Sequence, residues 1–207
     1  MTKYLGLYVR IIRVDSYLFN GWLVWTECSI KMFSILVIFT IFSCSMAENN
    51  CNEYNVGLDV NNLNQVIPDS AFSASSQATY GYRAARGRLN TIYERSSDKK
   101  GGWMATNTDT NPWINVDLQA DMEVAGVITQ GRQCGNNWVT EFRVEYKKSD
   151  CSSYHTINET FIGNTDRNTE VRNNFPTLIT ARNIRIHPEK WYGNAASLRF
   201  EVIGCRE

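Results

Sequence analysis

The feature that most constrains the fold is an alternation of apolar and polar residues with a period of two, which begins after residue 50. In one stretch, Ile114, Val116 and Leu118 alternate with Trp, Asn and Asp. Because successive side chains of a strand point to opposite faces, the pattern predicts antiparallel strands with one face on a core. The alternating stretches are WINVDL at 113–118, FRVEYK at 142–147, IRI at 184–186 and LRFEV at 198–202.

The segments between the predicted strands are rich in Asn, Gly, Ser and Asp. No segment of about ten or more residues has a convincing helical stripe, so we expect an all-β sandwich or jelly roll. Two polar stretches, 76–87 and 91–112, are longer than the loops of a compact domain usually are unless they have a function.

Residues 1–47 are predicted to be a secretory leader. Its apolar core is FSILVIFTIF at 33–42, which Lys31 precedes. Ser45 and Ala47 are placed as an A-x-A-like cleavage site. The apolar run is far shorter than the ~20 residues that span a bilayer, so a signal peptide is favoured over a transmembrane anchor.

Cleavage after Ala47 would leave a single secreted domain over 48–207. The leader is long, and either Met32 is its true start or residues 1–31 extend its amino-terminal region. The whole chain has 21 Lys and Arg and 21 Asp and Glu, and without the leader it has 17 and 19. This near neutrality gives no electrostatic case for binding nucleic acid or a strongly anionic surface.

The cysteines outside the leader are Cys51, Cys134, Cys151 and Cys205. An even number in a secreted chain predicts disulfides. A bond between Cys51 and Cys205 would tie the two ends of the domain together and stabilise it by about 5 kcal/mol. The strand predicted at 138–146 would extend about 30 Å, whereas bridged Cα atoms lie within about 7 Å. Cys134 and Cys151 are therefore predicted to be free or bonded to another chain.

The chain carries no recognisable catalytic or zinc motif. Its cysteine spacings include no C-x-x-C, and outside the leader only His155 and His187 accompany them. There is no G-x-S-x-G, H-E-x-x-H or glycine-rich phosphate loop, so an enzyme is not expected. One sequon, Asn158-Glu159-Thr160, predicts glycosylation at Asn158, in agreement with a secretory route.

Short motifs run in a fixed order along the chain. They are FSASS at 72–76, RLN at 88–90, GGW at 101–103, WINVDL at 113–118, VAGVITQGR at 124–132, NNWVTEFRVEY at 136–146, FIGNTDRNTEVRNNF at 161–175 and ARNIRIHPEKWYGNAASLRFEVIGC at 181–205. Together they resemble the discoidin domain family, also called the coagulation factor V/VIII type C domain. The chain departs from the family in its first loop, QATYGYRAARG, in KKSDCSSYH after the strand EFRVEY, and in Cys134.

The resemblance implies an eight-stranded antiparallel jelly-roll-like β-sandwich of the galactose-binding-domain type. Its ligand-binding loops protrude at one end, and here they correspond to 76–87, 91–112 and 130–138. Some related modules hold a structural calcium ion through loop carbonyls and acidic side chains. No other cofactor is expected, and no metal ligands are assigned.

Tyrosine, arginine and asparagine side chains dominate the candidate contacts. A tyrosine offers a flat apolar face and a hydroxyl, an arginine offers forked donors, and an asparagine donates and accepts. Trp103 either anchors the second loop to the core, which we favour, or reaches the ligand. Trp113, Trp138 and Trp191 are predicted to pack within the sandwich. The candidate ligand contacts are Tyr80, Tyr82, Arg83, Arg86, Trp103, Arg132, Asn136 and Asn137.

The expected function is that of a secreted, non-enzymatic adhesion module that recognises cell-surface or matrix carbohydrate. One alternative is peripheral binding to anionic phospholipid membranes through the loop aromatics and arginines. A second is a structural matrix component that binds extracellular proteins and cross-links through Cys134 or Cys151.

Overall fold

Antiparallel strands form the framework of the described chain, which comprises residues 51–62 and 67–206 of a computed structural model. The strands are β1 (Asn52–Asn55), β2 (Phe72–Ala74), β3 (Trp103–Met104), β4 (Ile114–Gln130), β5 (Trp138–Lys147), β6 (His155–Thr156), β7 (Phe161–Ile162), β8 (Val171–Tyr192) and β9 (Ser197–Arg206). Short 3-10 helices lie at η1 (Asp69–Ala71), η2 (Tyr80–Tyr82), η3 (Ala84–Gly87) and η4 (Arg95–Ser97).

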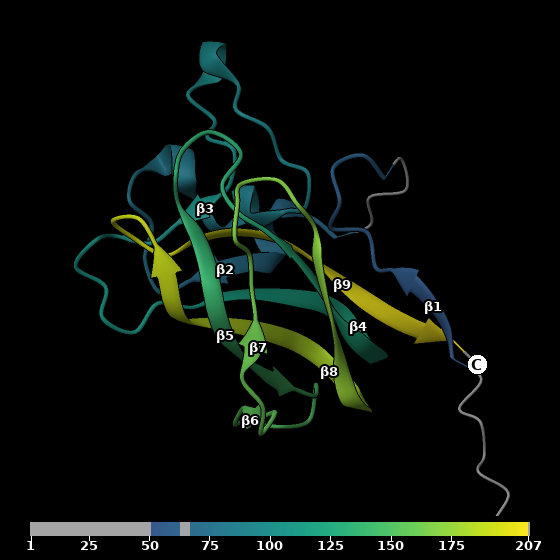
Figure 1. The fold of residues 1–207 in the computed structure, drawn as a ribbon. Coiled ribbons are helices and arrows are strands. Elements are labelled where there is room, and N and C mark those ends of the chain that lie inside the picture. The colour runs from purple at the N-terminus through teal and green to yellow at the C-terminus, as the bar shows by residue number, and fades with distance from the viewer. Residues whose placement is uncertain (1–50, 63–66, 207) are drawn as a thin grey trace, which may run out of the picture. The chain divides into compact units, whose positions relative to one another are not determined.

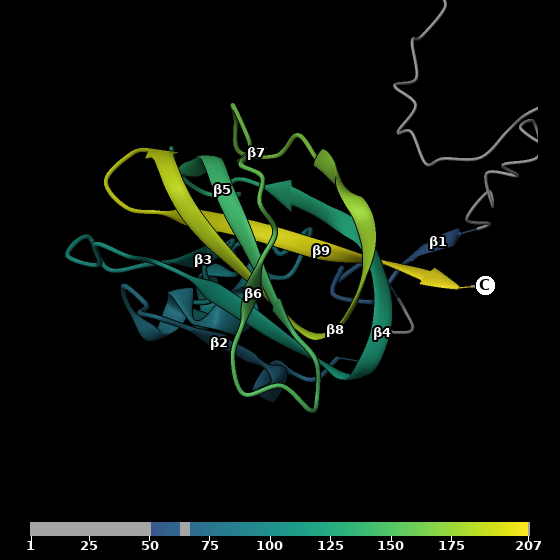
Figure 2. The ribbon, with the colours of Figure 1, turned by 90° about the horizontal axis from the view of Figure 1, so that it is seen from below.

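The strands follow the order β1-β9-β4-β8-β5-β6, and β2, β3 and β7 pair with β4, β9 and β5. The long strand β4 changes register between Asp117 and Met122 and again between Val124 and Gly126. Its first half pairs with β2 and the second half of β8, whereas its second half pairs with β9 and the first half of β8. The strands therefore curve around a shared core as two layers (Figures 1 and 2). The described residues form nine strands where eight were expected, because short ladders such as β6 and β7 are separate strands.

The apolar faces predicted from the alternation do form the core. Ile114, Val116 and Leu118 of β4 are at most 2% exposed, and Ile184 and Ile186 of β8 are fully buried. They pack in one cluster with residues of the opposite layer. The partners from β5 and β9 in that cluster include Phe142, Val144, Leu198, Phe200 and Val202.

Strand β9 departs from the predicted half-buried pattern. Its polar residues Arg199 and Glu201 are 2% and 0% exposed. Loop segments cover this second face: Arg199 donates to the carbonyl oxygen of Thr91 at 3.0 Å, and Glu201 accepts from the backbone N–H of Leu58 at 2.8 Å. The expectation of a solvated outer face on β9 is therefore wrong, because distant segments fold over it.

The disulfide between Cys51 and Cys205 is confirmed, with Cα atoms 5.3 Å apart. It reinforces the antiparallel pairing of β1 with β9. Cys134 is exposed and Cys151 is partly exposed, and both are free in the structure. The prediction that these two do not pair with each other is thus confirmed.

Two other sequence predictions concern processing. The predicted leader at 1–47 lies outside the residues that the structure describes. Asn158 is exposed between β6 and β7, and its glycosylation stays a prediction. Within 51–62 and 67–206, no helix is long and apolar enough to cross a membrane.

Candidate ligand-binding loops

The three predicted loops are joined by backbone and side-chain hydrogen bonds. The N–H of Lys100 donates to the carbonyl oxygen of Gly81 at 3.0 Å, which links the second loop to the first. Gln133 of the third loop donates its N–H to Gly101 O at 2.8 Å, and its Oε1 accepts from Tyr93 N at 3.1 Å. Parts of all three loops therefore meet at the end of the sandwich away from β6 (Figure 1).

The two tyrosines of the first loop have different roles. Tyr80 is 76% exposed, and the guanidinium of Arg83 lies 4.9 Å from the centre of its ring. Tyr82 is half-buried, and its hydroxyl accepts a hydrogen bond from Nη1 of Arg132 at 2.7 Å. Tyr80 is thus presented to solvent, while Tyr82 holds Arg132 of the third loop against the first.

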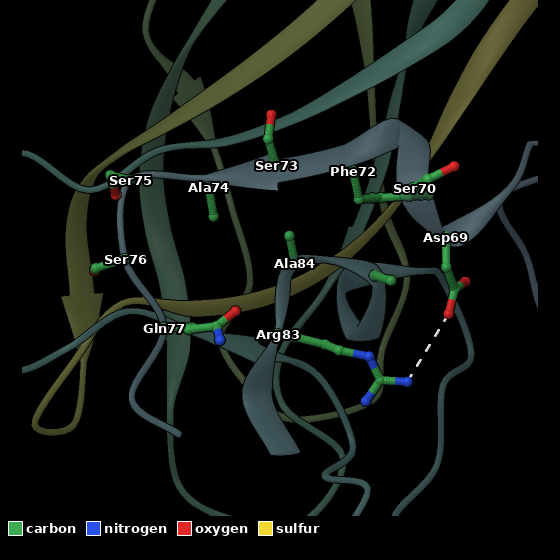
Figure 3. A pocket seen from close by; sticks show the side chains of 11 residues that line it. Asp69, Ser70, Phe72, Ser73, Ala74, Ser75, Ser76, Gln77, Arg83 and Ala84 are labelled. Atoms are coloured by element: carbon green, nitrogen blue, oxygen red, sulfur yellow. Dashed lines mark ion pairs between the residues drawn. The ribbon is translucent and has the colours of Figure 1, made fainter. Parts of the chain in front are cut away.

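Arg83 lines a pocket of about 590 Å³ between β2 and η3 (Figure 3). Its Nη2 is 3.8 Å from Oδ2 of Asp69, and this ion pair lies along one side of the pocket. The lining combines the apolar side chains of Phe72 and three alanines with polar side chains of four serines, one glutamine and the ion pair. The lining residues are Asp69, Ser70, Phe72, Ser73, Ala74, Ser75, Ser76, Gln77, Arg83, Ala84 and Ala85.

The side chain of Arg86 is turned into the protein. Only 11% of its side chain is exposed. Its Nε donates to the carbonyl oxygen of Lys100 at 2.7 Å, and its Nη2 donates to the carbonyl oxygen of Ile92. Burial lowers the pKa of Arg86, partly offset by the nearby carboxylate of Glu94. Its position corrects the prediction of a ligand contact, since the side chain is used to fix the second loop.

Trp103 and Asn137 are also structural. Trp103 is fully buried, and its Nε1 donates to the carbonyl oxygen of Ser76 at 2.9 Å. The structure therefore shows the anchoring alternative for Trp103 and not the ligand contact. Asn137 is 4% exposed and donates to Oδ1 of Asn194 at 2.9 Å. Of the two asparagines in the third loop, only Asn136 is exposed.

Sequence reasoning missed an exposed apolar side chain and a fourth loop. Ile92 of the second loop is 59% exposed. An isoleucine inside the polar stretch 91–112 could have indicated this exposed apolar side chain. The segment 163–170 lies against the other loops, because Gln130 Nε2 donates to Asn168 O at 2.9 Å and Arg199 donates to Arg167 O at 2.6 Å. No local pattern marks these long-range contacts.

The described residues offer no obvious metal centre. Within 51–62 and 67–206, no three His, Cys, Asp or Glu side chains gather into a group that could hold a metal ion. The buried carboxylate of Glu201 instead accepts backbone N–H groups of Leu58, Asp59 and Val202 at 2.8 Å. Burial raises its pKa to about 7, against the opposing effect of these donors. No calcium ligands are therefore assigned.

The sequence is similar to that of lactadherin. Mouse lactadherin is 32% identical over 181 residues, which cover 81% of this chain and 36% of lactadherin. The chain thus spans little more than a third of the length of that relative.

Solved structures share the fold. Discoidin II from Dictyostelium discoideum has a TM-score of 0.58 and 28% identity, covering 64% of this chain and 53% of discoidin II. The family 32 CBM of NanJ from C. perfringens, solved in complex with galactose, has a TM-score of 0.52 and 19% identity. The match covers 66% of this chain and 96% of that module. The family model of the F5/8 type C domain matches residues 71–202. The chain therefore belongs to the F5/8 type C domain family.

Proposed function

We propose that the chain is a secreted, non-enzymatic binding module that recognises carbohydrate on cell surfaces or in the extracellular matrix. The pocket beside the first loop carries this proposal. Its volume of about 590 Å³ falls within the range of ligand sites, about 300–1,000 Å³. The amide of Gln77, the carboxylate of Asp69 and the guanidinium of Arg83 line it, and these donors and acceptors suit the hydroxyls of a sugar.

The groups at the pocket mouth have spare hydrogen-bonding capacity. The 3.8 Å separation between Arg83 and Asp69 is longer than a hydrogen bond, so both groups can also bind a ligand hydroxyl. Ser70 and Gln77 are exposed beside them. The ring of Tyr80, next to Arg83, adds a flat apolar face that suits the C–H face of a pyranose.

The test is a glycan array probed with the full chain and with Arg83→Ala and Tyr80→Ala variants. Removing one charged hydrogen-bonding group or one stacking ring should weaken binding by about tenfold each. Arg95→Ala is the matched control, since Arg95 is an exposed arginine of the second loop. Absence of binding by the wild type, or binding by both loop variants as strong as that of the wild type, would refute the proposal.

Peripheral membrane binding is the second candidate, and the exposure of Ile92 favours it. Tyr80 and Ile92 are the large apolar side chains that the first and second loops expose. Lys99 and Lys100 lie close in sequence, but each is paired, with Glu94 at 3.2 Å and with Asp98 at 2.5 Å. Their attraction to an anionic surface is therefore partly offset.

Vesicle cosedimentation separates the two candidates. Membrane binding predicts that the wild type sediments with phosphatidylserine vesicles, that it does not sediment with phosphatidylcholine vesicles, and that Ile92→Asp abolishes sedimentation. Carbohydrate recognition predicts no vesicle binding and unchanged glycan binding by Ile92→Asp.

A further inference from the structure

An aromatic pair projects from the outer face of the sheet beside the third loop. Trp138 at the start of β5 lies opposite Tyr192 at the end of β8. Their ring centres are 4.4 Å apart, with 11° between the planes, and Tyr192 is 54% exposed. The next pair in register, Val139 and Trp191, packs on the core, so Trp138 and Tyr192 point the other way. The prediction that Trp138 packs within the sandwich is therefore wrong.

The turn after β8 is docked on the third loop, which fixes the position of Tyr192. Asn137 donates to Oδ1 of Asn194 at 2.9 Å and to the carbonyl oxygen of Ala195 at 3.4 Å. Gly193 has a φ of +94°, and a Cβ there would overlap the Asn137 side chain and the carbonyl oxygen of Asn136. The aromatic pair is thus held in place before any ligand arrives, which lowers the entropic cost of binding.

Polar side chains flank the aromatic pair along the chain. Asn136, two residues before Trp138, and Asn194, two residues after Tyr192, are both exposed. The hydroxyl of Tyr192 has no hydrogen-bond partner among the residues that the structure describes. Asn194 also lines a small pocket of about 140 Å³ together with Thr106 and Asn107. The site therefore combines a flat apolar face with uncharged donors and acceptors.

The charged residues next along the two strands are paired. Lys190 of β8 lies 2.8 Å from Glu141 of β5, and Arg143 lies 2.6 Å from Glu189. Within each pair the opposite charges neutralise each other. The surface beside Trp138 and Tyr192 therefore favours a neutral ligand over an anionic one.

We propose that Trp138 and Tyr192, with Asn136 and Asn194, form a subsite for a neutral pyranose whose C–H face stacks on Tyr192. An exposed aromatic face matches the apolar face of a sugar ring, and the amides and the phenol match its hydroxyls. This subsite rests on the proposed carbohydrate function. It is built from different residues than the pocket at Arg83, so the two contacts can be removed separately.

A cross-strand aromatic pair also stabilises the end of a ladder without any ligand. Tyr192→Phe removes only the hydroxyl and keeps both the stack and the aromatic face, whereas Asn136→Ala removes a proposed ligand contact and leaves the stack intact, so Asn136→Ala separates the two roles. The panel therefore comprises Tyr192→Ala, Tyr192→Phe and Asn136→Ala in the full chain. Ile162→Ala is the control, because Ile162 is a 64% exposed side chain of the neighbouring strand β7.

The experiment uses an array of galactose-, N-acetylgalactosamine-, N-acetylglucosamine- and mannose-terminated glycans, with thermal unfolding of each variant recorded in parallel. Tyr192→Ala, which removes the ring, should weaken binding about tenfold for each glycan that the wild type binds. Tyr192→Phe should stay within about threefold of the wild type, Asn136→Ala should weaken binding, and Ile162→Ala should leave it unchanged.

Three outcomes overturn the subsite. If the wild type binds glycans and Tyr192→Ala binds them equally, the subsite is wrong, while carbohydrate recognition at the Arg83 pocket stands. If the wild type binds no glycan on the array, both proposals are wrong. Should Tyr192→Ala fail to fold, Asn136→Ala decides the question, and unchanged binding by that variant overturns the subsite.

Discussion

The side chain of Arg199 donates through Nε to the carbonyl oxygen of Gly131 at 2.7 Å, deep between β9 and the third loop. Its Nη1 donates to Thr91 O at 3.0 Å, and its Nη2 donates to Arg167 O at 2.6 Å. Burial lowers the pKa of Arg199 to about 10, so the group stays charged at neutral pH. One buried guanidinium thus connects the second loop, the third loop and the segment 163–170.

Replacing Arg199 with Met should destabilise the domain by on the order of 3 kcal/mol, because several buried carbonyl oxygens lose their donor. Urea unfolding measures the change in the free energy of unfolding. Arg199→Lys, which keeps the charge but not the fork, should recover part of the loss. Arg95→Ala, at an exposed position, should change stability by less than about 0.5 kcal/mol. A Met variant as stable as the wild type would contradict the connecting role.

Removing the disulfide with Cys51→Ser and Cys205→Ser should lower the free energy of unfolding. The bond spans a sequence separation of 154 residues. In the chain-entropy model, closing a loop of this length contributes about 5 kcal/mol. Urea unfolding of the double variant beside Cys134→Ser checks this, and the exposed Cys134 should have little effect. Equal midpoints for the double variant and the wild type would contradict the prediction.

Glu201 should make stability depend on pH. Its pKa in the folded state is about 7, against an ordinary value of 4.5 for a glutamate. Between these values the unfolded chain is ionised at this position while the folded chain keeps its proton. The stabilising contribution is therefore fully present below the unfolded pKa and is lost as pH rises through 7, with a total on the order of 3 kcal/mol.

The measurement is urea unfolding of the wild type and Glu201→Gln between pH 4 and pH 8. The difference in stability between the two should change across this window. His187 acts in the opposite sense, because burial lowers its pKa and its contribution is lost as pH falls below about 6.5. It is common to both proteins and cancels in the comparison. Parallel pH profiles would show that Glu201 does not titrate there.

Replacing Trp103 with Phe should destabilise the fold by about 2 kcal/mol, because it leaves a void and removes the donor to Ser76 O. The first loop should also lose its fixed position, so glycan binding should fall together with stability. Trp113→Phe is the control, since Trp113 is only half-buried and lies under the guanidinium of Arg185. Equal losses in both variants would argue against a specific anchoring role for Trp103.

Strands and loops were predictable to different degrees. The alternation around Val116, Phe142 and Ile184 marked buried faces correctly, because the period of a strand is a local property of the chain. Of the eight candidate contacts, the structure buries Trp103 and Asn137 and uses Arg86 to hold backbone carbonyls. Residue type indicated what kind of group each side chain can bind. The fold decided whether that group belongs to the protein itself, as for Arg86, or whether the side chain is left exposed.

By itself, the sequence determined the all-β class, the faces of most strands and the Cys51–Cys205 bond, since these follow from local periodicity and from the positions of the two cysteines. Only the tertiary structure decided that both faces of β9 are buried and that Trp138 stacks on Tyr192. The reason is physical: burial and stacking depend on segments far apart in the chain, and their approach is set by the curvature and register of the whole sheet.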